Sequence, residues 1–222
     1  MKLIFSGEVY EVLPIMNGII FSYKKEEISD QTIVGYKMIS FSSGQFTDVE
    51  RNIYRLTKFG NNYTEVIKHI GNYIEVKSLL LAGGKIFLIF PDGKATLLDL
   101  DATPVWSGNL LYKGEAPSDV KYHGNALWAT YEEKNVLIRF NLNTMRNDLR
   151  LGNRKEPFSA PKDIFIEENR AIVSNYGSKK LIAVNLNDYT VEDLEEFEEG
   201  VKQYICIDEK RMVILESGLY LL

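Results

Sequence analysis

The sequence predicts an all-β fold of five similar units arranged in a ring, a five-bladed β-propeller with four antiparallel strands in each blade. Three observations carry this prediction. One segment recurs at a constant spacing, each copy breaks into four short β-rich runs, and the N-terminal residues resemble the strand that the last copy lacks. A fixed period of about 20 to 50 residues is the signature of stacked or ring-like repeat folds.

The repeat is clearest in two adjacent copies. The pattern Ala-Pro-x-Asp-Val/Ile begins at Ala116 and again at Ala160, so the period is 44 residues. The predicted strands of the first of these copies are 119–122, 126–131, 136–142 and 146–151. Short apolar and β-branched runs separated by polar turns indicate antiparallel strands rather than helices. Four strands in a repeat of this length are typical of a propeller blade.

The second copy also resembles a known repeat. Residues 171–186 read Ala-Ile-Val-Ser-Asn-Tyr-Gly-Ser-Lys-Lys-Leu-Ile-Ala-Val-Asn-Leu. This segment is similar to the YVTN-type propeller repeat, which also occurs in lactonase-like and NHL-like propellers: a strand ending in Asn-Tyr-Gly-Ser, a turn, and a strand ending in Asp or Asn. The resemblance covers two copies. It implies the fold and says little about activity, because propellers serve many functions.

The remaining copies are degenerate but can be placed along the chain. We expect one domain over 1–222, with blades at about 10–60, 61–115, 116–157, 158–199, and 200–222 together with 1–9. The segment 3–8 resembles 110–115, which is a fourth strand followed by the entry to the next blade. Pairing of the N-terminal strand with the C-terminal blade would close the ring and remove open sheet edges. In the first blade, residues 24–32 form a longer predicted loop between the second and third strands.

Composition narrows the range of partners. The chain has 26 basic and 31 acidic residues and a net charge of −5, which argues against a nucleic-acid surface. Cys206 is the single cysteine, so no intrachain disulfide can form. No secretory signal is visible, and no apolar run is long enough to cross a bilayer. We therefore expect a cytoplasmic protein without a membrane partner.

Two aspartates are the candidate catalytic residues. Asp119 and Asp163 occupy equivalent places at the start of innermost strands, near the mouth of the central channel. They could form a carboxylate pair for acid–base work, or each could bond to backbone N–H groups of its own turn, which is the interpretation we favour. His123 is a weaker candidate base, and His69 is the other histidine. No zinc-ligand spacing and no cofactor fingerprint is present, so we expect no metal and no cofactor.

A second set of residues suggests a binding surface. Aromatic side chains recur at or just past the end of the second strand in four blades, with amide and lysine side chains beside them. The set comprises Tyr23, Phe90, Tyr131, Tyr176, Asn175 and Lys134. Aromatic and amide groups together suit a sugar, a flat ligand or a protein hot spot. The alternative is that each aromatic ring packs over its own turn.

Two functions from different classes follow. The favoured one is a non-catalytic recognition or scaffold propeller that binds a protein or a small ligand on the channel-mouth face. The alternative is a lactonase-like or glycosidase-like hydrolase that uses the channel carboxylates. Regular blades without a dense acid–base cluster favour recognition.

Overall fold

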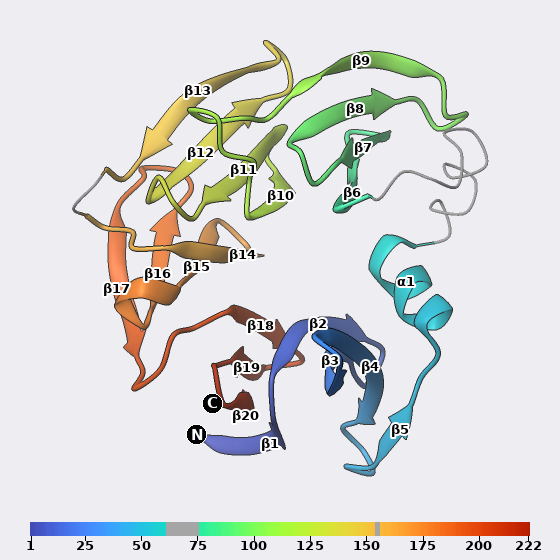
Figure 1. Cartoon of the computed structure of the whole chain (residues 1–222). Coiled ribbons are helices and arrows are strands. Elements are labelled where there is room, and N and C mark those ends of the chain that lie inside the picture. Colours follow the sequence, from blue (N-terminus) through green and yellow to red (C-terminus); the bar gives the residue numbers. More distant parts are fainter. Residues whose placement is uncertain (61–75, 154–155) are drawn as a thin grey trace.

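The computed structural model describes residues 1–60, 76–153 and 156–222, and it confirms the five-bladed β-propeller. Five four-stranded antiparallel sheets surround a central axis, and each sheet turns one edge towards that axis (Figure 1). The innermost strands are β2 (Val9–Ile15), β6 (Ser78–Ala82), β10 (Asp119–His123), β14 (Pro161–Glu167) and β18 (Gln203–Ile207).

The other strands follow outward in sequence order within the first four blades. The first blade continues with β3 (Gly18–Ile28), β4 (Gln31–Ser40) and β5 (Phe46–Asp48). The second continues with β7 (Lys85–Ile89), β8 (Lys94–Leu98) and β9 (Pro104–Asn109). The third continues with β11 (Ala126–Tyr131), β12 (Val136–Asn141) and β13 (Arg146–Leu151). The fourth continues with β15 (Arg170–Asn175), β16 (Lys180–Asn185) and β17 (Val191–Glu196), with a short 3-10 turn, η1 (Tyr176–Ser178), after β15.

The fifth blade takes its outermost strand from the other end of the chain. It contains β18, β19 (Lys210–Ile214), β20 (Gly218–Leu221) and then β1 (Lys2–Ser6), which pairs antiparallel with β20. The approach is close at Gly218, where a Cβ atom would lie 2.2 Å from the backbone oxygen of Phe5. Only glycine allows the two strands to pair at this distance.

The core lies between neighbouring blades. In the third blade, all six residues of β11 are buried, because this second strand is covered by a blade on each side. The outermost β17 is exposed along almost its whole length, as expected of an edge strand that faces water. Buried clusters therefore join adjacent blades; one of them packs Phe87 of the second blade with Leu127 of the third.

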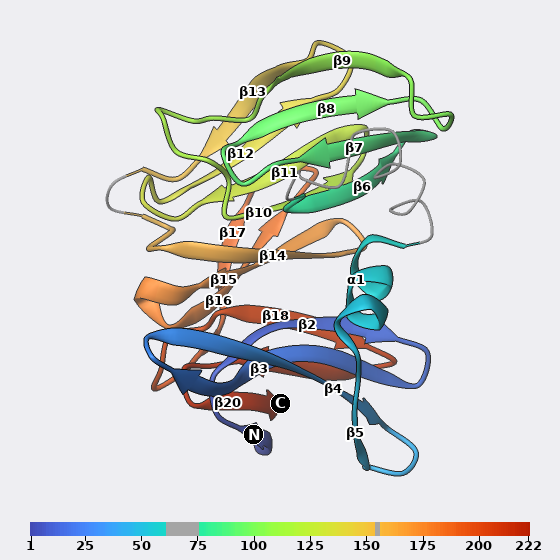
Figure 2. The same cartoon turned by 45° about the vertical axis from the view of Figure 1, so that its right-hand side comes forward.

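A helix, α1 (Arg51–Phe59), was not anticipated from the sequence, which assigned these residues to the first blade. It lies between the first and second blades and contacts both β2 and β6 (Figure 2). Its buried Phe59 packs in one cluster with Ile86 and Leu88 of the second blade. The helix ends at Gly60, whose φ of 71° allows its N–H to bond to the Leu56 carbonyl.

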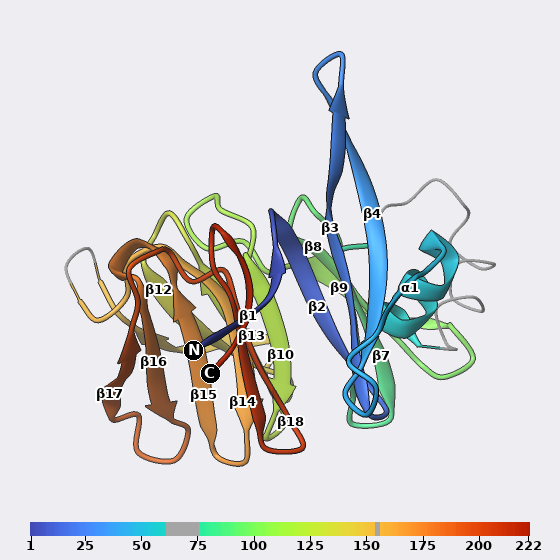
Figure 3. The same ribbon diagram turned by 90° about the horizontal axis from the view of Figure 1, so that it is seen from below.

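The predicted loop at 24–32 is wrong. β3 continues to Ile28 and β4 begins at Gln31, so these residues extend a β-hairpin that projects from the rest of the molecule (Figure 3). The turn residues Ser29 and Asp30 have φ values of 47° and 64°. Two consecutive positive φ values are the geometry of a two-residue turn that matches strand twist.

Candidate functional site

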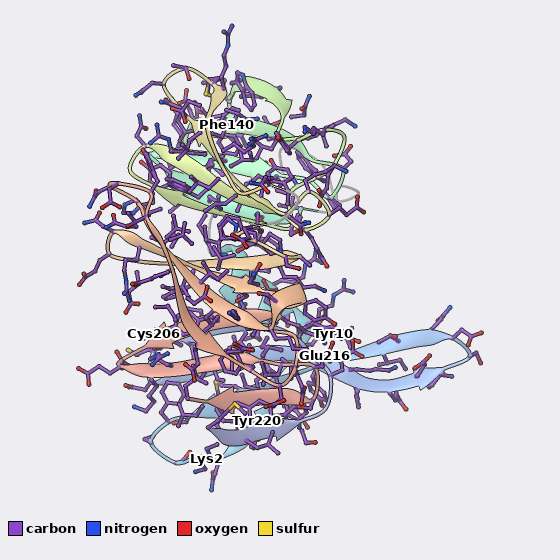
Figure 4. All side chains as sticks on the ribbon, turned by 90° about the vertical axis from the view of Figure 1, so that its left-hand side faces the viewer. Lys2, Tyr10, Phe140, Cys206, Glu216 and Tyr220 are labelled. Atoms are coloured by element: carbon purple, nitrogen blue, oxygen red, sulfur yellow. The ribbon has the colours of Figure 1, made fainter. Side chains whose placement is uncertain are left out.

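The axis of the propeller contains a cavity at the end where the innermost strands begin. Its volume is about 730 Å³, it is open to solvent, and residues from all five blades and from α1 line it. Tyr10, at the start of β2, and Glu216, in the turn before β20, lie on the side of the molecule from which the β3–β4 hairpin projects, whereas Cys206 lies on the opposite side (Figure 4). Val34 and Tyr36 of β4 continue the wall of this axial cavity towards the hairpin.

Three lysines form one level of the cavity wall, and we call Lys77, Lys162 and Lys202 the lysine layer. Lys162 and Lys202 directly precede Asp163 and Gln203, which also line the cavity, and Lys77 directly precedes the first residue of β6. The backbone N–H groups of Lys77 and Lys202 donate to the carbonyls of Ile89 and Ile214, which are equivalent positions in their blades. Lys162 lies at an irregularity in the pairing of β14 with β15, and such bulges redirect side chains.

The ion pairs of the lysine layer are loose. Lys162 Nζ is 3.4 Å from Glu132, and Lys202 Nζ is 3.9 Å from Glu8. Lys77 Nζ donates to the carbonyl of Pro117. Burial lowers the pKa of Lys77, and nearby Asp119 only partly offsets this effect. These ammonium groups therefore retain hydrogen-bonding capacity for a ligand.

An acidic layer lies directly beneath the lysine layer, one position further along the inner strands. It is formed by Glu11, Asp119 and Asp163. Asp119 Oδ2 accepts a hydrogen bond of 2.6 Å from Lys121 Nζ and one of 3.2 Å from the backbone N–H of Ile164. The second bond crosses from the third blade to the fourth. Asp119 therefore both joins two blades and presents its carboxylate beside the cavity.

Asp163 is the member of this acidic pair whose ionisation is disfavoured. Burial raises the pKa of its carboxyl well above the ordinary value, the adjacent Asp119 carboxyl raises it further, and Lys121 offsets only part of the change. Although burial alone would lower the pKa of Lys121, the two carboxyl groups raise it. The pair therefore favours the protonated form of Asp163, because two adjacent buried carboxylates repel each other.

The third acidic residue is held by α1. Glu11 Oε2 accepts hydrogen bonds from the hydroxyl of Tyr54 and, at 2.8 Å, from Lys58 Nζ. The Tyr54 hydroxyl also lies 3.3 Å from Ser22 Oγ. Burial, reinforced by the Glu11 charge, raises the pKa of Tyr54, so this phenol stays a hydrogen-bond donor. The helix thus supplies a polar wall where the inner strands of the first and second blades are separated.

The structure brings Asp119 and Asp163 together but leaves His123 apart from them. His123 is the last residue of β10 and Asp119 the first, so their backbones are about 13 Å apart at the usual rise per strand residue. His123 does not line the axial cavity. His69 lies outside the described residues. Asp119 bonds to backbone, as favoured above, but to the next blade rather than to its own turn.

Two members of the predicted aromatic surface are buried. Tyr131 is 1% exposed and its hydroxyl donates to the Leu110 carbonyl. Asn175 is fully buried, and its side-chain oxygen accepts a 2.7 Å bond from the N–H of Ser159. Both side chains hold the fold and offer no surface to a partner.

The other members are dispersed. Tyr23 packs edge-on against Phe5, with ring centroids 5.0 Å apart. Phe90 packs against the core of the second blade. Tyr176 lies beside the axial cavity, because Lys162 Nζ, which lines it, is 4.1 Å from the centre of the Tyr176 ring. Lys134 lines a separate surface pocket.

The lysine layer was missed at the sequence level, although a signal was available. Lys162 is the unassigned residue of Ala-Pro-x-Asp in the second copy of the repeat, and Lys77 and Lys202 stand one place before the residues that align with Asp163. A search for recurrent charge at each position of the repeat would have found it. Tyr54 and Lys58 could not be found this way, because α1 lies outside the repeat.

Within residues 1–60, 76–153 and 156–222, no group of three or more His, Cys, Asp or Glu side chains is arranged to hold a metal ion. In the same part of the chain, no helix is long and apolar enough to span a bilayer.

Comparisons with known proteins support the fold alone. No protein-family model matches the chain, and no curated protein matches it either. Among solved structures, the chain is similar to the WD40 β-propeller domain of Doa1, with a TM-score of 0.55 and 7% identity over 96% of this chain and 62% of that one. It is also similar to the computationally designed Ika8 protein, with a TM-score of 0.52 and 10% identity over 97% of this chain and 58% of that one. The chain therefore spans less than two thirds of the length of either structure.

Proposed function

We propose that this chain is a non-catalytic recognition propeller that binds a small, polar, charge-bearing ligand in the axial cavity. One observation carries the proposal: lysine and acidic layers from different blades converge on a single open cavity of about 730 Å³. This volume lies within the range of about 300 to 1,000 Å³ that is usual for ligand pockets. A wall this polar selects a ligand that replaces the hydrogen bonds lost by bound water.

The charge pattern favours a ligand with both anionic and hydrogen-bonding groups. With Asp163 neutral, four lysines of the wall and the adjacent Lys121 face the carboxylates of Glu8, Glu11, Glu132 and Asp119. The described groups therefore leave a slight positive excess, although the chain as a whole carries −5. An amino acid, a hydroxy acid or an acidic sugar has the required combination of groups.

A small ligand is favoured over a protein partner. Propellers commonly bind proteins, and the channel-mouth face could do so as well. Protein hot spots, however, depend on accessible aromatic anchors, and Tyr131 is buried in the core. The concave axial cavity suits a compact ligand better.

A library of amino acids, hydroxy acids and sugars, screened by thermal shift, tests the proposal. A ligand at one hundred times its Kd stabilises the folded state by about 2.7 kcal/mol. We expect the shift to disappear in a Lys162→Gln/Lys202→Gln variant and to persist in a Lys2→Gln/Lys210→Gln control, which removes the same charge from the fifth blade away from the cavity. Equal shifts in both variants would reject the axial cavity as the site.

The hydrolase alternative rests on one observation, the neutral Asp163 carboxyl beside the cavity, which could act as a general acid. Its geometry is unfavourable. Asp163 and Asp119 interact directly, whereas the two carboxyl groups of a glycosidase are about 5 Å or more apart so that substrate fits between them. Turnover of a fluorogenic glycoside or lactone that is abolished by Asp163→Asn would establish the alternative.

A further inference from the structure

A second pocket lies on the third blade, at the surface and separate from the axial cavity. Its volume is about 480 Å³. Three cationic side chains line it: Lys113 from the turn after β9, Lys134 from the turn between β11 and β12, and Arg150 from β13. The phenol of Tyr112 lies among them, with its hydroxyl 3.4 Å from a guanidinium nitrogen of Arg150.

Hydrogen bonds of the backbone hold the two lysines of this pocket in place. Lys113 and Gly114 have φ values of 50° and 86° and form a tight turn, closed by paired hydrogen bonds between Tyr112 and Glu115. The carboxylate of Glu115 then accepts the backbone N–H groups of Glu133, at 2.8 Å, and of Lys134, at 3.1 Å. This carboxylate fastens the two turns together. Both of its oxygens accept backbone amides rather than a lysine ammonium group.

The pocket has a positive excess. Among the described residues that line it, Glu133 is the only carboxylate, and it lies 3.7 Å from Lys134 with 77% of its side chain exposed. Among the described lining side chains, three cations face one carboxylate, on a chain whose net charge is −5. The hydrogen bond from Arg150, together with the nearby Lys113 charge, holds the pKa of the Tyr112 phenol below its usual value. A lowered phenol pKa is the expected response to a positive field at the hydroxyl.

We propose that this pocket binds the phosphate group of a phosphate monoester, held by Lys113, Lys134 and Arg150 with the Tyr112 hydroxyl as a fourth donor. Guanidinium groups bind phosphate through two parallel hydrogen bonds, and ammonium groups add point charges from other directions. A phosphate dianion suits a pocket lined by more cations than carboxylates. The pocket is large enough to take part of the attached group as well.

Calorimetric titration with inorganic phosphate, at constant ionic strength set with chloride, tests the site. We expect binding to the wild type to weaken by about tenfold or more in a Lys134→Gln/Arg150→Gln variant, because each cation contributes a charge-assisted hydrogen bond. Arg146→Gln is the control, since Arg146 is an exposed cation on the same strand outside the pocket. Circular dichroism melts verify that all variants are folded. Absence of phosphate binding to the wild type, or an equal loss in the control, would overturn the proposal.

Two phosphate monoesters then show which kind of ligand carries the bound phosphate group. A phosphoserine peptide and a sugar phosphate are each titrated beside their unphosphorylated forms. Tighter binding of either phosphorylated form supports the site, and the preferred one identifies the kind of ligand. Equal binding of phosphorylated and unphosphorylated forms contradicts it. This test is independent of the axial cavity, whose Lys162 and Lys202 remain intact throughout.

Discussion

The Tyr131→Phe substitution tests whether the Tyr131 hydroxyl stabilises the fold or binds a ligand. The Tyr131 hydroxyl is buried and donates to the carbonyl of Leu110, which is itself 2% exposed. The ring packs against Tyr112 at a centroid distance of 5.6 Å, and phenylalanine preserves this contact. The substitution therefore removes one buried hydrogen bond and leaves the aromatic packing in place.

The expected magnitude follows from that geometry. A buried carbonyl left without its donor costs about 1 to 3 kcal/mol, the desolvation penalty of an unsatisfied polar group. For a domain of this size, each kcal/mol lowers the melting temperature by about 2 to 4 °C. We expect Tyr131→Phe to melt roughly 4 to 8 °C below the wild type, if the loss is near the middle of that range.

Thermal melts followed by circular dichroism give the comparison, with Tyr176→Phe as the matched control. The Tyr176 hydroxyl bonds to Glu216 at an exposed position, so its removal should change stability by less than about 0.5 kcal/mol. Ligand shifts of Tyr131→Phe in the polar-compound screen should equal those of the wild type. Unchanged stability of Tyr131→Phe combined with loss of ligand binding would show that the Tyr131 hydroxyl binds the ligand and does not stabilise the fold.

Three other substitutions test the acidic layer and the join between the chain ends. The folded-state pKa of Asp163 is raised, so its contribution to stability is complete below the unfolded value of about 3.9 and is lost as pH rises through the folded value. The melting temperature of Asp163→Asn should therefore gain on that of the wild type as pH rises above about 4, and a constant difference would contradict the raised pKa. Lys121→Met should destabilise the protein by roughly 1 to 3 kcal/mol in urea unfolding, since it leaves the partly buried Asp119 carboxylate without its cation. An unchanged unfolding midpoint would show that this ion pair does not contribute to stability. Gly218→Ala should lower the melting temperature, because the added methyl group meets the Phe5 carbonyl, and a variant that melts with the wild type would argue against the β1–β20 pairing.

The repeat made the strand order predictable, because the same hydrophobic and turn pattern recurs wherever one blade packs on the next. The segment 3–8 could be matched to 110–115 for that reason, and β1 does pair with β20. The helix α1 occurs once and has no second copy to reveal it. The Lys-Lys-Glu-Glu sequence at 24–27 suggested a loop because it lacks apolar alternation, yet local cross-strand pairing continues through it.

The position of a residue in the repeat did not predict whether its side chain is buried. Tyr131 and Tyr176 occupy nearly equivalent places in the repeat, but Tyr131 is covered by the linker that carries Leu110 and Tyr112, whereas Tyr176 lies beside Lys162 at the cavity. These differences arise from the neighbouring blade rather than from the residue's own strand. The contact between Asp119 and the backbone of Ile164 is likewise a feature of blade packing.

A high-resolution crystal structure of the protein with a hit from the polar-compound screen tests the central claim most directly. We expect ordered density in the axial cavity, with ligand atoms at hydrogen-bonding distance from lysines of at least two blades, Lys162 and Lys202 among them. A ligand bound elsewhere on the molecule, with only water between the lysine and acidic layers, would contradict it.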